Sequence, residues 1–163
     1  DFDISPSVTT AGDSVLPIDG LMLSSGGFYT AAAYDTLENG IKAMLLMDDY
    51  ADLEDGNIRV RAIHTAWSVG TVDIWNIPAE GEPGKLYDDV PFGAVGDYYD
   101  LPAGAYTLGF DVDEDMNPDV IFEIPALAAG TVANVFATSD ADGGVHLNAQ
   151  LQDGAIATIQ PSI

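Results

Sequence analysis

The chain has 163 residues and 47% of them are hydrophobic, so it is long enough to bury a core and its composition does not indicate disorder. Its 27 acidic residues face only four lysines and arginines, and the formal net charge of -23 makes nucleic acids and anionic membranes poor partners. No cysteine is present, which excludes disulfides, thiolate metal sites and cysteine nucleophiles. A membrane-spanning helix needs a run of about 18 or more apolar residues, and the sequence contains no such run. We therefore expect no membrane insertion.

Residues 1–50 are predicted to form the last three or four strands of a β-sandwich unit whose earlier strands are missing. The stretch GGFYTAAAYDTLENGIKAMLLMDD in this region runs parallel to AGTVANVFATSDADGGVHLNAQLQDG in the second half of the chain. Gly27 and Gly40 have the same spacing as Gly130 and Gly143. In both stretches a Gly-led strand enters an Asn-Gly or Asp-Gly turn and an apolar strand follows, which is typical of a β-hairpin.

A complete sandwich unit is predicted for residues 58–163, after a short acidic linker at residues 51–57. Segments with alternating or β-branched residues recur there about every ten residues, separated by Gly, Asp, Asn and Pro, and we find no amphipathic helix. The expected strands are residues 58–64, 71–77, 105–113, 120–124, 131–138 and 145–151, with one or two more within 85–101. This number of strands in this length predicts an all-β, antiparallel, immunoglobulin-like β-sandwich.

Three stretches of the predicted complete unit resemble a known family. IRVRAIHTA is followed by VDIW and then by VPFGAVGDYYDLPAGAYTL. These stretches resemble the bacterial and archaeal domain of unknown function 4397, a secreted or cell-surface β-sandwich repeat with an R-V-x-H-A start, a V-D-V strand and an F-G-x-x-x-x-Y-x-x-L-P-A-G-x-Y-T run. The chain departs from the family at TAWSVG, where members often have a Pro- and Asp-rich loop. The resemblance implies a sandwich fold and an extracellular or cell-surface location, but no reaction.

The stretch GFDVDEDMNPDVIF sets acidic residues at every second position and is the strongest candidate for a metal site. Oxygen ligands at this spacing suit calcium if the segment stays extended. The candidate ligands are Asp111, Asp113, Asp115, Asn117 and Asp119. An EF-hand is excluded, because Met116 and Phe122 stand where that loop needs Gly and Glu. Because Asn-Pro and Asp also form ordinary turns, we favour an acidic turn and keep calcium as the alternative; Asp140 and Asp142 form a second, weaker candidate.

No catalytic motif is evident. His64 and His146 lack the neighbouring ligands that a transition-metal site needs, and we predict that each is a packed or edge histidine. There is no G-x-S-x-G elbow or comparable nucleophile setting, so we predict that the chain is not an enzyme.

Four aromatic residues and two arginines have alternative roles. A sugar-stacking platform would need Trp67, Trp75, Tyr98 and Tyr99 to surface together, whereas aromatic residues at alternating strand positions more often fill a sandwich core. Arg59 and Arg61 hold half of the positive charge of the chain and stand two positions apart. We predict that they project to one face and bind carboxylates in a structural role.

The incomplete first unit leads to the functional hypothesis. A half sandwich cannot enclose its core, and YTAAAYD and IKAMLLM would present an apolar face and an open edge that favour pairing with another chain. The chain could be part of a tandem array, its two units could merge into one sandwich, or a neighbouring subunit could supply strands. We therefore predict a non-catalytic extracellular structural or adhesive protein of a surface filament or array, with copies of itself or neighbouring repeats as partners. The alternative is an extracellular module that binds carbohydrate or acts through calcium.

Overall fold

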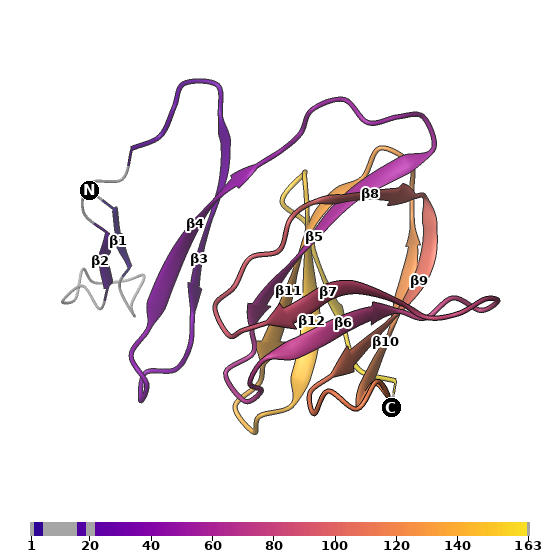
Figure 1. Ribbon diagram of the computed structural model, residues 1–163. Helices are drawn as coiled ribbons and strands as arrows, with labels where there is room; N and C mark the ends of the chain where they lie inside the picture. Colours follow the sequence, from indigo (N-terminus) through magenta and orange to yellow (C-terminus); the bar gives the residue numbers. More distant parts are fainter. Residues whose placement is uncertain (1, 5–15, 19–21, 163) are drawn as a thin grey trace. The chain divides into compact units, whose positions relative to one another are not determined.

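In the computed structural model, every regular element among the described residues is a β-strand (Figure 1). The structure describes residues 2–4, 16–18 and 22–162, and the rest of the predicted partial unit, including residues 5–15, lies outside this part. Within the described residues there is no helix, and therefore none that could span a membrane. The chain divides into two units, Asp1–Ala51 and Asp52–Ile163, each of which is described below by itself.

The first unit contains two antiparallel strand pairs in its described residues. β1 (Phe2–Ile4) pairs with β2 (Leu16–Ile18), and β3 (Phe28–Tyr34) pairs with β4 (Lys42–Asp48). The β3–β4 pair confirms the hairpin that the sequence predicts around its Asn-Gly turn.

The turn between β3 and β4 is held by one acid. The Asp35 carboxylate accepts hydrogen bonds from the Thr36 amide (2.8 Å), the Asn39 side chain (3.0 Å) and the Lys42 ammonium (2.7 Å). The Lys42 and Asn39 hydrogen bonds lower the pKa of Asp35. Gly40 has a φ of 89°, a left-handed conformation that glycine adopts without steric cost.

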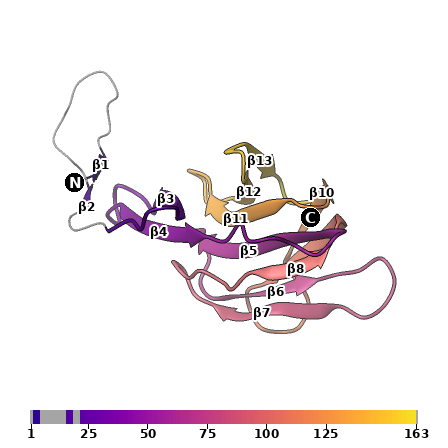
Figure 2. The same ribbon diagram turned by 90° about the horizontal axis from the view of Figure 1, so that it is seen from above.

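The second unit is a β-sandwich, which confirms the predicted all-β fold (Figures 1 and 2). Its strands are β5 (Asn57–Thr65), β6 (Val72–Asn76), β7 (Gly84–Val90), β8 (Tyr99–Pro102), β9 (Gly104–Asp111), β10 (Val120–Leu127), β11 (Val132–Ser139), β12 (Val145–Leu151) and β13 (Ile156–Ile159). One sheet has the order β10-β9-β6-β7 and the other has the order β13-β12-β11-β5-β8. The pair β5 and β11 is parallel, whereas the other neighbouring pairs are antiparallel.

The two sheets enclose an apolar core. Its most deeply buried members include Val72, Phe110, Phe122 and Leu147, and the rings of Phe110 and Phe122 meet edge to face with centroids 5.1 Å apart. A cavity of about 110 Å³ remains between the sheets and is lined almost entirely by apolar side chains, among them Ala149.

Hydrogen bonds join the sheets along both edges of the sandwich. At one edge the Tyr99 hydroxyl donates to the Leu86 carbonyl oxygen at 2.7 Å, which connects β8 to β7. At the other edge the Ser162 amide donates to the Ile121 carbonyl oxygen at 2.8 Å, which ties the end of the chain to β10. These hydrogen bonds add to the burial of the apolar core, which is the main force that holds the two sheets together.

The predicted strands of the second unit agree with the observed ones to within one residue at each end, except at three places. β9 ends at Asp111, so the predicted continuation through residue 113 is wrong, because the chain bends there and Glu114 and Met116 adopt positive φ. β10 continues past Pro125 to Leu127, and a register shift beyond Ile124 accommodates the proline. β13 was not predicted.

Candidate functional site

Two buried carboxylates lie opposite each other on neighbouring strands of the four-stranded sheet. Asp73 on β6 is the register partner of Asp111 on β9, and the two residues are 4% and 1% exposed. Like charges directly opposite each other destabilise a sheet, and a buried carboxylate is costly without a partner. The charge of each acid therefore needs a partner.

Lys85 on β7 neutralises Asp73. Its ammonium lies 2.5 Å from Asp73 Oδ2 and 2.5 Å from Asp88 Oδ1, and the Asp89 amide donates to Asp73 Oδ1 at 2.8 Å. Burial by itself would raise the pKa of Asp73, but the ammonium and the amide outweigh it and keep this pKa below its usual value. The two carboxylates, Asp73 first, raise the pKa of Lys85. One oxygen each from Asp73, Asp88 and Asp89 lies within 4.8 Å of the others, so this cluster contains its own cation.

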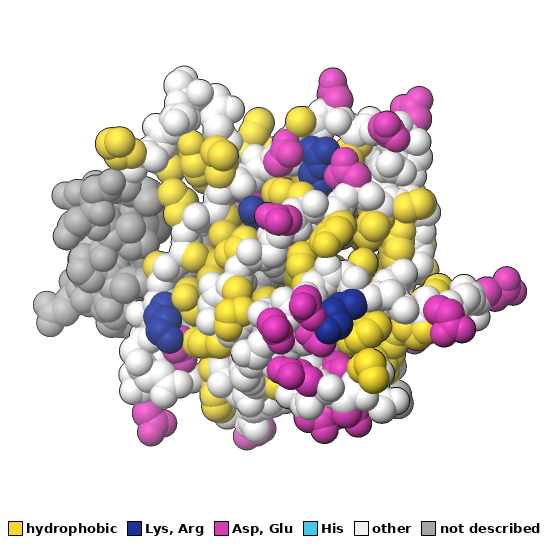
Figure 3. Space-filling view, in the orientation of Figure 1, with side chains coloured by type: hydrophobic (Ala, Val, Ile, Leu, Met, Phe, Trp, Pro, Cys, Tyr) yellow, Lys and Arg dark blue, Asp and Glu magenta, His cyan; other side chains and the backbone are white. Residues whose placement is uncertain are grey.

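Asp111 belongs to a second acidic cluster in the β9–β10 loop. One carboxylate oxygen each from Asp111, Asp113 and Asp115 lies within 4.8 Å of the other two. Asp111 Oδ2 accepts a hydrogen bond from the Met116 amide at 2.9 Å, whereas its Oδ1 is buried and has no hydrogen-bond partner. Figure 3 shows acidic side chains at this end of the four-stranded sheet.

The other two predicted calcium ligands hold the loop in shape. Asp119 Oδ2 accepts from the Val112 amide at 2.8 Å, and the Asn117 amide and side chain donate to Asp115. From the sequence, we expect the five candidate ligands to lie on an extended segment. This expectation is wrong, because β9 ends at Asp111. The three aspartates nevertheless meet, because the bent loop brings their carboxylates together.

Sequence reasoning missed the cluster around Asp73. A signal was present, because Asp73 interrupts the apolar strand VDIW, where a charged side chain needs a specific partner. Its position opposite Asp111 is set by the β6–β9 pairing, which no local pattern reveals.

The weaker candidate in the β11–β12 turn has a structural role. Asp140 Oδ1 accepts hydrogen bonds from the Asp142 amide at 2.9 Å and from the Gly144 amide at 2.8 Å. These bonds fix the hairpin turn in the way that Asp residues commonly do. Asp142 is exposed and is not part of an acidic cluster among the described residues.

Both histidines are engaged in local structure. His64 is buried, and its Nε2 donates to the Gly70 carbonyl oxygen at 2.7 Å while Nδ1 accepts from the Ala66 amide at 3.4 Å. Burial lowers the pKa of His64, so the ring is held in its neutral form. His146 Nε2 lies 2.9 Å from the hydroxyl of Thr138 on the neighbouring strand. The prediction of packed or edge histidines is confirmed.

Three of the four aromatic side chains, Trp75, Tyr98 and Tyr99, have separate partners, and the fourth, Trp67, is 37% exposed. Trp75 lies under Lys85, whose ammonium is 5.4 Å from the ring centroid, and its Nε1 is buried. Tyr98 lies under the Arg61 guanidinium, at 4.4 Å, whereas Tyr99 contacts Tyr87 with ring centroids 5.0 Å apart. These contacts hold the aromatic rings against different parts of the sandwich.

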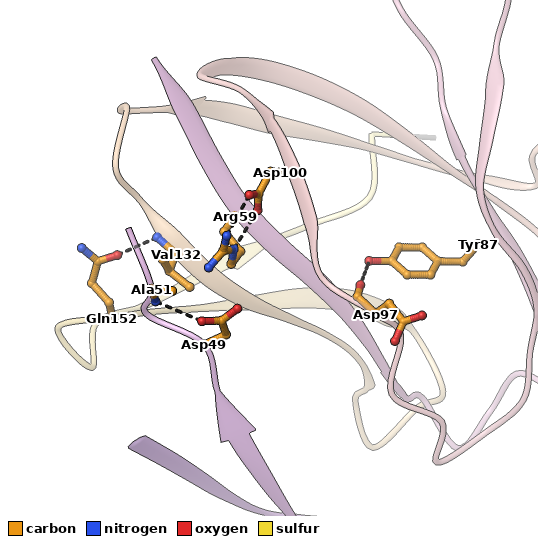
Figure 4. Close-up of polar contacts among 8 residues, drawn as sticks. All are labelled: Asp49, Ala51, Arg59, Tyr87, Asp97, Asp100, Val132 and Gln152. Carbon is orange, nitrogen blue, oxygen red and sulfur yellow. Dashed lines mark hydrogen bonds and ion pairs between the residues drawn. The ribbon is translucent and has the colours of Figure 1, made fainter. Parts of the chain in front are cut away.

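Arg59 has the carboxylate partner that the sequence predicts. Its Nε and Nη2 donate to the two oxygens of Asp100 at 2.7 and 2.8 Å, which joins β5 to β8 (Figure 4). This bond lowers the pKa of Asp100. Arg61 Nε donates to Asn134 Oδ1 at 2.7 Å, between the parallel strands β5 and β11.

The first unit presents an apolar surface that we call the hairpin face. The register of β3 and β4 places three cross-strand pairs on it: Tyr29 with Met47, Ala31 with Leu45, and Ala33 with Ala43. None of these residues is charged, and Leu45 and Met47 are 37% and 67% exposed. Figure 3 shows hydrophobic side chains on the surface over β3 and β4.

The hairpin face differs from the corresponding surface of the second unit. β4 and β12 each begin two residues after a glycine, Gly40 and Gly143, and each has seven residues. When the two strands are aligned on these glycines, the positions of Ala43, Leu45 and Met47 are occupied by His146, Asn148 and Gln150. β12 therefore has polar side chains where β4 has apolar ones.

No protein-family model and no curated protein matches the sequence. The resemblance to the domain of unknown function family therefore stays a prediction.

Proposed function

We propose that the chain is a non-catalytic structural or adhesive β-sandwich protein of the cell surface or extracellular space that assembles with copies of itself. The hairpin face carries this proposal, because it is an exposed, uncharged, apolar sheet surface on a chain of net charge -23. Exposed apolar surfaces of this kind mark contact sites.

A second copy of the chain is the occupant that fits this surface. Any two copies repel each other through their net charge, so a contact between them requires a surface without carboxylates. The hairpin face meets this requirement, and the polar β12 surface at the same positions does not offer the same apolar contact. Repulsion between copies weakens as salt screens it, so the assembly should strengthen as salt is added.

The non-catalytic part of the proposal is supported by the histidines. The two nitrogens of His64 are engaged with backbone groups, and His146 contacts a strand threonine. Neither ring is positioned by a carboxylate, as a general base in a catalytic triad is.

Light scattering during size-exclusion chromatography, with negative-stain imaging of the same fractions, tests the proposal. We expect the wild-type chain to form oligomers or filaments whose mass increases with protein and salt concentration. The Met47→Lys and Leu45→Lys variants should dissociate to monomers. Ile156→Lys is the matched control, since Ile156 on β13 is also an apolar strand residue and is also 67% exposed. A wild-type chain that stays monomeric at high salt, or an equal effect of the control, would overturn the proposal.

A further inference from the structure

We propose that Asp111, Asp113 and Asp115 bind one calcium ion in the β9–β10 loop. This inference does not depend on assembly, because the site lies within one chain. Its three carboxylates come from a five-residue stretch at the end of a core strand, and one oxygen from each is within 4.8 Å of the others.

The unpartnered oxygen of Asp111 is the observation that points to a ligand. Asp111 is 1% exposed, its Oδ2 accepts from the Met116 amide, and its Oδ1 has no donor. A buried charged oxygen without a partner costs several times more than a typical hydrogen bond contributes. An ion held between Asp111 and the two exposed aspartates would satisfy this oxygen and remove the repulsion among the three.

An ordinary acidic turn has a different arrangement. In the β11–β12 turn, Asp140 is close to backbone amides, and two of them donate to its Oδ1. In the β9–β10 loop the buried acid keeps one oxygen unpartnered, although it has a backbone donor on the other. Asp140 is exposed, so water can reach its second oxygen, whereas the second oxygen of Asp111 is buried and has no partner.

No lysine or arginine among the described residues pairs with the three aspartates. The four lysines and arginines contact other groups: Lys42 contacts Asp35, Arg59 contacts Asp100, Arg61 contacts Asn134, and Lys85 contacts Asp73 and Asp88. None of the ion pairs in the described part of the chain includes Asp111, Asp113 or Asp115. The described side chains therefore provide no counter-charge for this cluster, and an ion from solution would provide one.

Asp111 is buried at the end of β9, where the β9–β10 loop packs against the strand. Pro118 packs on β9 at Gly109, where an added Cβ would come within 2.6 Å of the proline ring. The loop therefore folds back against its own strand at Gly109, and Asp111 is buried while Asp113 and Asp115 stay exposed. An ion could enter from the solvent side and be held by the buried carboxylate.

Calcium fits these ligands better than magnesium does. Calcium accepts six to eight oxygens in a flexible geometry, so carboxylates, loop carbonyl groups and water can complete its shell. Magnesium requires near-ideal octahedral geometry and gives up its water reluctantly.

Isothermal titration of the full chain with calcium chloride tests the proposal. We expect one saturable site per chain, and a rise in the thermal midpoint with calcium. Asp113→Asn and Asp115→Asn should each weaken binding by about tenfold or more, which corresponds to about 1.4 kcal/mol. Both side chains are exposed, and asparagine keeps the oxygen that accepts from the Asn117 amide, so these variants should fold.

The matched control is Asp142→Asn, which removes the same charge from another exposed turn. It should bind calcium as the wild type does. The absence of saturable binding at millimolar calcium would overturn the proposal, as would an equal loss in the control. Equal competition by magnesium would overturn the assignment of the ion. Because all of these measurements are made on single chains, they remain informative whether or not the protein assembles.

Discussion

Filling the cavity between the sheets should stabilise the second unit. Ala149 on β12 is buried, faces the core and lines the cavity of about 110 Å³. An Ala149→Leu substitution adds three carbon atoms at a position where space already exists. The same substitution at Ala66, which is fully buried in the core but does not line the cavity, adds them where there is none.

The expected size follows from the added apolar groups. Burying a methylene group is worth about 0.8 kcal/mol, so three carbons contribute about 2.4 kcal/mol. Fixing the leucine side chain costs about 1 kcal/mol of rotamer entropy. The net gain in the free energy of unfolding is about 1.4 kcal/mol, or about 5 °C in the thermal midpoint of a domain of this size.

Urea unfolding followed by tryptophan fluorescence measures this effect, because both tryptophans, Trp67 and Trp75, lie in the second unit. Ala149→Leu should raise the urea midpoint without changing the slope of the transition. Ala66→Leu should lower the midpoint by overpacking, at a cost of about 1–3 kcal/mol. If both variants destabilise the protein equally, the sandwich has no cavity at Ala149 and the reasoning is refuted.

Three further predictions concern polar groups of the second unit. Burial lowers the pKa of His64 in the folded state below its unfolded value of 6.5, so the stability that the neutral ring contributes is complete above pH 6.5 and is lost as the pH falls toward the folded pKa. Urea midpoints measured on both sides of pH 6.5 should show this loss in the wild type and a smaller one in His64→Gln. Lys85→Met should lower the thermal midpoint, because buried Asp73 loses its cation, and a second substitution, Asp73→Asn, should restore part of the loss; no recovery would contradict the role of the pair. Tyr87→Phe should cost about 1 kcal/mol, because the hydroxyl that donates to the Asp97 carbonyl oxygen at 2.8 Å is removed, and spectrophotometric titration should lose a tyrosine whose pKa burial raises to about 12; an unchanged titration curve would contradict this assignment.

The strands of the second unit were predictable where their own residues alternate. β12 begins and ends where the sequence predicts, because Val145, Leu147 and Ala149 face the core between polar residues. β13 has no such pattern, since Ile156 is largely exposed, and it is a strand because it pairs with β12. A strand defined by its neighbour leaves little trace in its own sequence.

The candidate metal site was predictable in its residues but not in its geometry. The spacing of Asp111, Asp113 and Asp115 indicates a candidate metal site in the loop. Their carboxylates come together through a bend of the chain and not along a strand. Asn117 and Asp119 were expected as ligands, yet their hydrogen bonds shape the loop. Whether an oxygen in such a loop points at an ion or at an amide depends on backbone angles that residue spacing does not define.

The core explains why two acids face each other in this sheet. On β6 and β9, the pair next to Asp73 and Asp111 is Ile74 with Phe110, and both of these side chains are buried in the core. A slip of one residue would turn Ile74 to the other face of the sheet and bring Asp73 into the core, so the register cannot relax to separate the acids. The charges must be balanced where they stand, and Lys85 balances only Asp73. The same apolar packing that fixes the sandwich therefore keeps Asp111 opposite Asp73, and among the described side chains Lys85 pairs with Asp73 and not with Asp111.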